Sequence, residues 1–147
     1  MPKFSEIPWI AAHIALYQTD PEQARLWDST PVGGPGLLPT LLLTTKGRRS
    51  GEPRPLPLIY GTAGNSYVVI ASKGGMPTHP LWFRNLEAEP ACEVQVGAKH
   101  FSARARVATG EERARLWQQL AAIYPPYLDY QKATERRIPV VVLDPIA

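Results

Sequence analysis

The stretch from Lys46 to Arg54, K-G-R-R-S-G-E-P-R, gathers four cations and two glycines into nine positions, with Glu52 as its only acidic residue. Glycines at 47 and 51 permit backbone conformations in which successive N–H groups point into one concavity, and the arginines add forked, charge-assisted donors. The sequence therefore predicts an anion-binding loop whose guest is a phosphate or a carboxylate. A solvated basic turn between two strands is the alternative.

Aromatic residues supply a second chemical feature. Trp82 and the tyrosines at 124, 127 and 130 could form flat walls around a planar ring, and a tyrosine hydroxyl could donate a proton. The alternative is that these side chains are core or rim residues, where aromatic side chains commonly lie.

The sequence lacks the residue patterns that metal binding and nucleophilic catalysis require. His13, His79 and His100 are scattered without partners at metal-ligand spacing, so no metal site is predicted and each histidine is expected to be structural or solvated. Ser50 stands at the fourth place of Gly-Arg-Arg-Ser-Gly between two strands, which is not a nucleophile elbow. Cys92 has the apolar parity of its strand and is expected to be a buried thiol. A bound cofactor could then supply the reaction while the protein supplies its position.

Length and composition predict one domain over residues 1–147, because 147 residues with 44% hydrophobic content suffice for a single core. The 16 prolines and 11 glycines are dispersed among apolar runs, which indicates many turns and short strands. Sixteen cations against 13 anions is a mild excess for a nucleic-acid binder, so that function ranks last. One cysteine excludes an internal disulfide, and the lack of an apolar leader predicts a cytoplasmic protein.

An N-terminal helical segment is predicted over about residues 5–28. Ser5 is expected to cap a first helix, and Asp20-Pro21-Glu22-Gln23 is a capping-box pattern that predicts a second helix to about Trp27. The first helix is apolar on both sides, so it buries two faces or contacts lipid or a partner. Its lack of a strongly charged face favours core packing, with peripheral membrane contact as the alternative.

Strands are expected over residues 41–45, 55–60, 66–72 and 138–143, together with a hairpin formed by residues 92–96 and 101–107. Pro53, Pro55 and Pro57 share one parity, which predicts that one edge of their strand is unpaired or bulged. Helices are expected over about residues 80–89, with Leu81, Trp82 and Leu86 inward, and after a capping box of Thr109 and Glu112. Residues 124–130 should break that last helix. Many antiparallel strands with helices outside predict a small barrel.

Four ordered motifs resemble a known family: L-L-T-T-K-G-R-R-S-G-E-P-R at 42–54, A-S-K-G-G at 71–75, H-P-L-W-F-R-N-L at 79–86 and Y-P-P-Y-L-D-Y at 124–130. The chain resembles the deazaflavin (coenzyme F420)-dependent nitroreductase family of actinobacteria, the group A F420H2-dependent reductases of the flavin-like split β-barrel superfamily. The match runs over most of the chain and is loose before about Leu37. It implies an α+β split β-barrel, FMN-binding-like, mostly antiparallel, with helices packed outside.

The resemblance also implies site residues. The phosphate and acidic tail of F420 would be held by Arg48, Arg49, Ser50, Gly51 and Arg54, with Lys73 completing the cationic rim. The deazaflavin ring would lie against Pro55, Leu56, Pro57, Leu58, Ile59, Ile70, Ala71, Ser72, Leu81, Trp82, Phe83, Arg84, Asn85 and Tyr127. The substrate pocket would include Trp82, Tyr124 and Tyr130.

In the reaction that the resemblance implies, a hydride passes from reduced F420 to a small-molecule acceptor, a quinone, an activated alkene (enone or lactone) or a nitroaromatic. The proton would come from Tyr127, Tyr130, Ser72 or water. FMN, with its short phosphate chain, is expected to bind less well than F420. The non-enzymatic alternative is a carrier that sequesters F420 or a lipid-like ligand. Ile59, where some family members have an aromatic residue, and the paired prolines 125 and 126 depart from the family in ways that bear on nitroimidazole activation.

Overall fold

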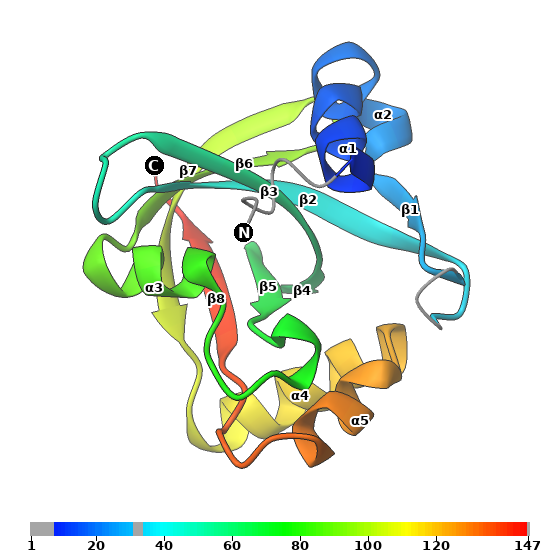
Figure 1. Ribbon diagram of the computed structural model, residues 1–147, viewed down its shortest axis with the longest axis vertical. Helices are drawn as coiled ribbons and strands as arrows, with labels where there is room; N and C mark the ends of the chain where they lie inside the picture. Colours follow the sequence, from blue (N-terminus) through cyan, green and yellow to red (C-terminus); the bar gives the residue numbers. More distant parts are fainter. Residues whose placement is uncertain (1–7, 31–33, 147) are drawn as a thin grey trace.

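One curled antiparallel sheet, with helices outside it, forms the frame of the computed structural model, which describes residues 8–30 and 34–146 (Figure 1). Its strand order is β1-β2-β6-β7-β8-β5-β4, and β3 pairs with β2 off this path. The strands are β1 (Leu26–Asp28), β2 (Leu37–Lys46), β3 (Pro53–Ile59), β4 (Gly61–Ala63), β5 (Ser66–Ile70), β6 (Ala91–Val96), β7 (Lys99–Val107) and β8 (Val140–Pro145). The prediction of an α+β split β-barrel is confirmed.

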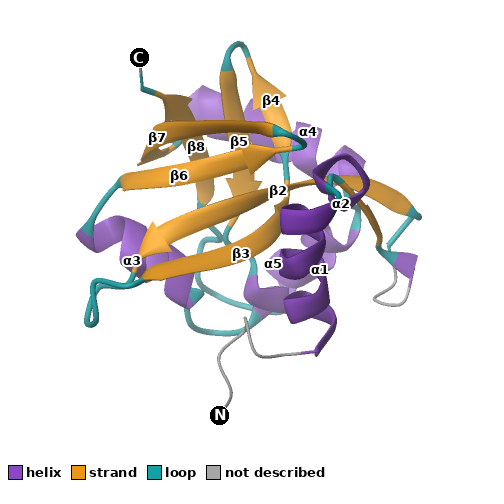
Figure 2. Ribbon diagram, turned by 90° about the horizontal axis from the view of Figure 1, so that it is seen from above, coloured by secondary structure: helices purple, strands orange, loops and turns teal. Residues whose placement is uncertain are grey.

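Strand β2 is the centre of the sheet because it pairs with three other strands. Its first residues pair with β1. Leu42 to Thr44 pair with β6 and Thr40 to Lys46 pair with β3, and these two strands flank β2 (Figure 2). The run from Leu41 to Leu43 is buried throughout instead of alternating, because both faces of the strand are covered there. Leu41 and Leu43 belong to one buried cluster, whereas Leu42 packs with Tyr17 and Ala24 of the N-terminal helices. The loop that carries the basic cluster begins where β2 ends.

The proline-rich strand β3 is an edge strand, as its sequence predicted. Among the described residues it pairs with β2 alone, and Pro55 and Pro57 lie opposite Thr44 and Leu42. Since opposed residues of an antiparallel pair alternate between hydrogen-bonded and non-hydrogen-bonded positions, prolines of one parity fit the positions whose nitrogens face away from β2. The prolines therefore cost β2 no hydrogen bond.

The helices differ from prediction in several places. They are α1 (Pro8–Thr19), α2 (Pro21–Ala24), the 3-10 turn η3 (Lys73–Gly75), α3 (Leu81–Ala88), α4 (Gly110–Ile123) and α5 (Pro126–Lys132). Asp20 caps α2 as predicted, accepting from the Gln23 amide at 3.3 Å, but α2 ends at Ala24 and the next residues pair with β2 as β1. The expectation that the second helix reaches Trp27 was wrong, because sheet pairing overrides local helix propensity there. Ser5 lies outside the described residues.

Two further corrections concern α4 and the segment after it. Thr109 stands at the N-cap of α4 but makes no side-chain capping hydrogen bond, and the Glu112 carboxylate accepts two hydrogen bonds from Arg106, at 2.7 and 3.1 Å, instead of completing the box. The predicted break after α4 is only two residues long, Tyr124 and Pro125, since Pro126 occupies the first turn of α5, where a missing N–H costs little. In α3, Leu81 is 59% exposed, and Phe83 is buried with Trp82 and Leu86 instead.

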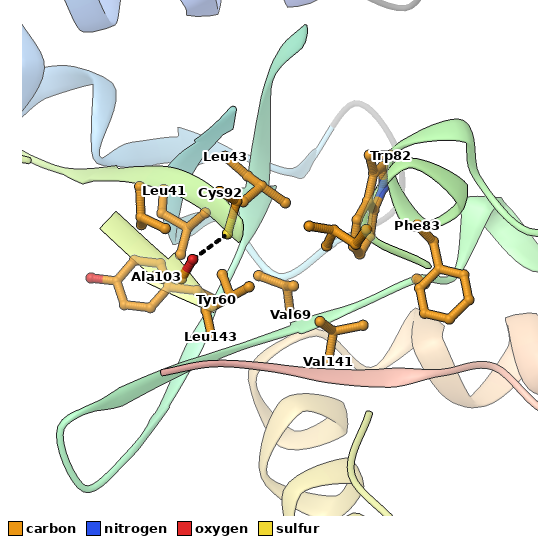
Figure 3. Close-up of a cluster of buried hydrophobic side chains, with 13 residues drawn as sticks. Leu41, Leu43, Tyr60, Val69, Trp82, Phe83, Cys92, Ala103, Val141 and Leu143 are labelled. Atoms are coloured by element: carbon orange, nitrogen blue, oxygen red, sulfur yellow. Dashed lines mark hydrogen bonds between the residues drawn. The ribbon is translucent and has the colours of Figure 1, made fainter. Parts of the chain in front are cut away.

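Two buried clusters lie on opposite faces of the sheet. One contains Leu41, Leu43, Val69 and Val141, with Trp82 and Phe83 covering it from α3 (Figure 3). The other is covered by α4 and α5 and contains Val68, Ile70, Leu116, Leu120, Tyr127, Val140 and Val142. Neighbouring valines of β5 and β8 thus point to different clusters, as the two-residue period of a strand requires. Cys92 belongs to the first cluster, where burial raises the pKa of its thiol to about 12.

Helix α1 packs through one face. Ile10, His13 and Tyr17 are buried, whereas Trp9 is 52% exposed and stacks on Trp27 with ring centroids 5.7 Å apart. The Tyr17 hydroxyl donates to the Thr40 carbonyl of β2 at 2.5 Å. No helix in the described part of the chain is long and apolar enough to cross a membrane.

Candidate functional site

The basic loop between β2 and β3 is closed by its own backbone. The Gly47 amide donates to the Glu52 carbonyl at 2.8 Å, and the Gly51 amide donates to the Gly47 carbonyl at 2.7 Å. Gly51 has φ 75°, a left-handed conformation that favours glycine. A Cβ added at Gly47 would lie 2.8 Å from the Ser50 hydroxyl and 3.2 Å from the Glu52 carbonyl. Both glycines are therefore needed for this turn.

A buried asparagine of α3 anchors the loop from below. Asn85 accepts from the Arg48 amide at 3.2 Å, and its own amide donates to the Thr45 hydroxyl of β2 at 3.0 Å. The side chains of Arg48 and Arg49 are exposed, and Arg54 donates to the Ser50 hydroxyl at 3.2 Å. The result is a fixed backbone carrying guanidinium groups that face solvent and can bind an anion.

A cavity of about 210 Å³ opens beside this loop. Its walls combine the basic loop with the start of β3 and one face of α3, and comprise Gly47, Arg48, Arg49, Ser50, Arg54, Pro55, Leu56, Leu81, Trp82 and Asn85. We call it the cationic cavity. It suits an elongated group with negative charge.

A second cavity, of about 570 Å³, adjoins the first, because Leu56 and Trp82 line both. We call it the apolar cavity. Its walls come from α1, β1, β2, β3, the end of β5 and the segment after it, α3, and α5 with the turn before it. They comprise Trp9, Ile10, His13, Trp27, Thr40, Leu56, Pro57, Leu58, Ile59, Ile70, Ser72, Lys73, Gly74, Met76, Pro80, Trp82, Tyr124, Tyr127 and Tyr130. Its size and aromatic lining suit a planar ring together with a second small molecule.

Three tyrosines gather on one wall of the apolar cavity. The hydroxyls of Tyr124 and Tyr130 are 2.7 Å apart, and the rings of Tyr124 and Tyr127 meet edge to face with centroids 4.8 Å apart. Burial raises the pKa of Tyr127 and of Tyr124 well above the usual range, and the neighbouring tyrosines add to the shift. Both phenols therefore stay protonated and able to donate a hydrogen bond at neutral pH.

Most of the predicted site residues come together around these two cavities, and four do not. Gly51 lies on the solvent side of the turn, Ala71 is fully buried, Phe83 belongs to the core, and Arg84 is paired with Glu87 at 3.8 Å on the outer side of α3. Lys73, expected at the rim of the basic loop, lines the apolar cavity instead and donates to Thr78 at 3.1 Å.

Sequence reasoning missed the wall that α1 and β1 contribute. Trp9, Ile10, His13 and Trp27 line the apolar cavity, and His13 Nε2 lies 2.7 Å from the Ala24 carbonyl. Their only signal in the sequence was a first helix apolar on both sides. In the described part of the chain, no group of three or more histidine, cysteine or acidic residues could hold a metal ion.

Comparison with known proteins identifies the family to which this chain belongs. A family model described as F420H(2)-dependent quinone reductase matches residues 29–145, which include both cavities apart from the α1 and β1 side chains before that range. The chain belongs to this family. Its cofactor is coenzyme F420.

Individual relatives are similar to this chain in both sequence and structure. An F420H(2)-dependent quinone reductase of Mycobacterium tuberculosis H37Rv is 43% identical over 112 residues, covering 74% of this chain and 75% of that protein. A solved F420-H2 dependent reductase (FDR-A) superposes with a TM-score of 0.67 and 42% identity, covering 71% of this chain and 93% of the other. A solved structure described as a domain-swapped dimer is 36% identical, with a TM-score of 0.70, covering 91% and 94% of the two chains.

The residues present fit F420 on structural grounds. The loop leaves a space at Gly47 that an added Cβ would fill, and three arginines surround it. This arrangement suits the anionic tail. The adjoining apolar cavity, with Trp82 shared by both, suits the ring.

Proposed function

We propose that this protein is an F420H2-dependent quinone reductase. The observation that supports this function is that the cationic cavity and the apolar cavity adjoin at Leu56 and Trp82. A cofactor with a charged tail and a planar ring would occupy both at once, and the remaining volume beside the tyrosines would hold the acceptor. When bound, reduced F420 supplies the hydride.

The chain's own residues then have separable tasks. Arg48, Arg49 and Arg54 neutralise the tail, while the buried Asn85 keeps the loop backbone in place. Pro57, Leu58 and Ile59 of β3 form an apolar wall that excludes water from the ring. FMN lacks the acidic tail beyond its phosphate, so we expect it to bind less well, and FMN is the matched ligand control.

The proton is assigned to the tyrosine wall, with Ser72 and water as the alternatives. Tyr127 and Tyr130 line the apolar cavity, and a phenol is protonated at neutral pH and can donate to a ligand beside it. We expect Tyr127→Phe to bind F420 as the wild type does and to lose turnover with a quinone, because the ring stays and only the hydroxyl is removed. Tyr130→Phe should also lose turnover, and it removes the hydrogen bond between the Tyr124 and Tyr130 hydroxyls as well. Full turnover in both variants would leave Ser72 or water as the donor.

The direct test is to titrate the purified protein with F420 and follow cofactor fluorescence, then to add menadione to the complex with reduced F420. Binding at micromolar ligand followed by oxidation of the cofactor is expected. Absence of binding contradicts the proposal. Binding without oxidation by any quinone identifies the alternative, a carrier of F420 or of a lipid-like ligand.

The shape and lining of the apolar cavity bear on which acceptors the protein reduces. The apolar cavity is lined mainly by apolar and aromatic side chains, which suits a neutral, electron-poor ring better than a charged substrate. We expect quinones to be reduced, and enones and nitroaromatics to be accepted where their electron-poor carbon or nitro group fits beside Tyr127 and Tyr130. A screen of the three classes with reduced F420 measures this directly.

Peripheral membrane contact through α1 is a separate proposal. Trp9 is 52% exposed on α1, and Leu37 is 68% exposed at the start of β2. Flotation with lipid vesicles measures this contact, and Trp9→Ser should reduce it. Vesicles that fail to carry the wild-type protein contradict it.

A further inference from the structure

Arg136, in the segment between α5 and β8, binds one loop through almost every donor it has. Its Nε donates to the Met76 carbonyl at 2.7 Å, Nη1 to the Ala71 carbonyl at 3.2 Å, and Nη2 to the Ser72 carbonyl at 2.6 Å. Nη1 also lies 3.1 Å from His79 Nδ1. One planar guanidinium thus joins three backbone carbonyls and a ring nitrogen within residues 71–79.

The loop that Arg136 binds has an unusual backbone. Lys73 has φ 46°, and among the described residues it is the one non-glycine residue with positive φ, followed by Gly74 at φ 61° and Gly75 at φ 78°. A left-handed lysine is strained and persists only where its surroundings hold it. The loop's own backbone adds two hydrogen bonds, Gly75 to Ser72 at 2.9 Å and Met76 to Lys73 at 3.1 Å.

The same loop forms part of the apolar cavity and lies directly on the tyrosine wall. Ser72, Lys73 and Met76 line the cavity. A Cβ added at Gly75 would come within 2.6 Å of the Tyr130 carbonyl oxygen, so the turn touches the backbone of α5 at Tyr130. Movement of the loop would therefore displace side chains on two walls of the cavity.

We infer that Arg136 is a positioning residue: it holds the loop of residues 71–79 in the conformation that presents Ser72 and Lys73 to the apolar cavity. Its effect on the cofactor rests on the proposed function, whereas its effect on the loop does not. Arg136 itself lines neither cavity, so it acts through the loop alone.

The first test measures the loop without any ligand. In Arg136→Gln, hydrogen exchange of the Gly75 and Met76 amides should be about tenfold faster or more, because several charge-assisted hydrogen bonds to the loop are lost. Arg137→Gln is the matched control, since Arg137 is the exposed neighbour and has no hydrogen bond or ion pair with the described residues. Exchange as slow in Arg136→Gln as in Arg137→Gln would overturn the inference.

The second test measures binding. Arg136→Gln should weaken F420 binding about tenfold or more, and Arg136→Lys should restore only part of it, because one ammonium cannot reach three carbonyls in a plane. If Arg136→Gln does not fold, hydrogen exchange and F420 affinity are both measured on Arg136→Lys. In Arg136→Ala, added methylguanidine should recover affinity by refilling the vacated position.

The two failures are distinguishable. A wild-type protein that does not bind F420 defeats the proposed function, whatever the variants do. The inference is overturned instead if the wild type binds F420 and Arg136→Gln shows fast exchange with unchanged affinity. The guanidinium would then stabilise the loop without positioning the site.

Discussion

At the scale of single residues, the basic loop separates its exposed charges from the buried group that fixes its backbone. The Arg48 and Arg49 side chains are exposed, while Asn85 beneath them is buried and bonded to both the loop and β2. Replacing the arginines should therefore change ligand affinity with little effect on the fold.

We expect Arg48→Ala with Arg49→Ala to weaken F420 binding, with each lost charge-assisted contact costing about 1.5 to 3 kcal/mol. Fluorescence titration measures this. The charge-matched control is Arg104→Ala with Arg115→Ala, since both residues are exposed and line neither cavity. Equal affinity of the two double variants would show that the tail binds elsewhere.

His79 should make stability depend on pH. Burial, and then the positive charges of Arg136 and Arg84, lower the pKa of His79 below its usual 6.5 against an opposing effect of Glu87. The unfolded chain therefore binds a proton near pH 6.5 that the folded protein takes up only at lower pH. The contribution of His79 to stability is present above that pH and is lost as pH falls through the lowered pKa.

Asparagine at position 79 gives the test, because its side-chain oxygen can accept from Arg136 and does not titrate. Urea unfolding at neutral pH and at about pH 5.5 should show the wild type losing stability relative to His79→Asn as the solution becomes acidic. A stability difference that stays constant between the two pH values contradicts the lowered pKa.

At the scale of elements, β3 shows how a strand can keep one edge unpaired without recruiting another chain. Pro53, Pro55 and Pro57 remove donors along one side of the strand, which pairs with β2 on the other side. The same strand lines both cavities through Leu56.

Pro55→Val with Pro57→Val should promote self-association, because the new N–H groups offer an exposed edge for strand pairing. Light scattering at increasing protein concentration measures this. Pro35→Val, at an exposed position in the connector before β2, adds an apolar side chain away from the edge and should leave the mass unchanged. If the double variant has the same mass as Pro35→Val, the prolines do not prevent self-association.

At the scale of the whole molecule, stability comes from the two clusters on opposite faces of the sheet, and β2 shows the contrast between core and surface. Leu41 is fully buried at 0% exposure, whereas Leu37 of the same strand is 68% exposed. The cluster around Leu41 also supports Trp82, which belongs to both cavity walls (Figure 3).

Leu41→Ala should lower the free energy of unfolding by about 2 to 5 kcal/mol, since the removed methyl groups leave a cavity in a packed core. Leu37→Ala should change it by less than about 0.5 kcal/mol, because the side chain is already in water. Urea unfolding of both variants tests this. Equal losses would mean that the N-terminal end of β2 is covered in solution.

Local patterns were predicted well where each group's partner lies nearby in the chain. The basic loop, the Asp20 cap and the proline edge all depend on neighbours within a few residues. The Thr109 capping box failed because Arg106, which also bonds Asp144 of β8 at 2.8 Å, takes up Glu112. The second helix failed because the residues after Ala24 pair with β2.

Most of the strands, the proline edge and the cationic turn after β2 could be predicted from the sequence alone, because alternation, prolines and clustered charge act over short distances along the chain. The surroundings of the apolar cavity follow from packing between distant elements, since Trp9 of α1 and Tyr130 of α5 line the same cavity. The same holds for Arg136, whose partners lie some 60 residues away at Met76 and Ser72. The physical reason is that packing, not local propensity, chooses which distant groups become neighbours.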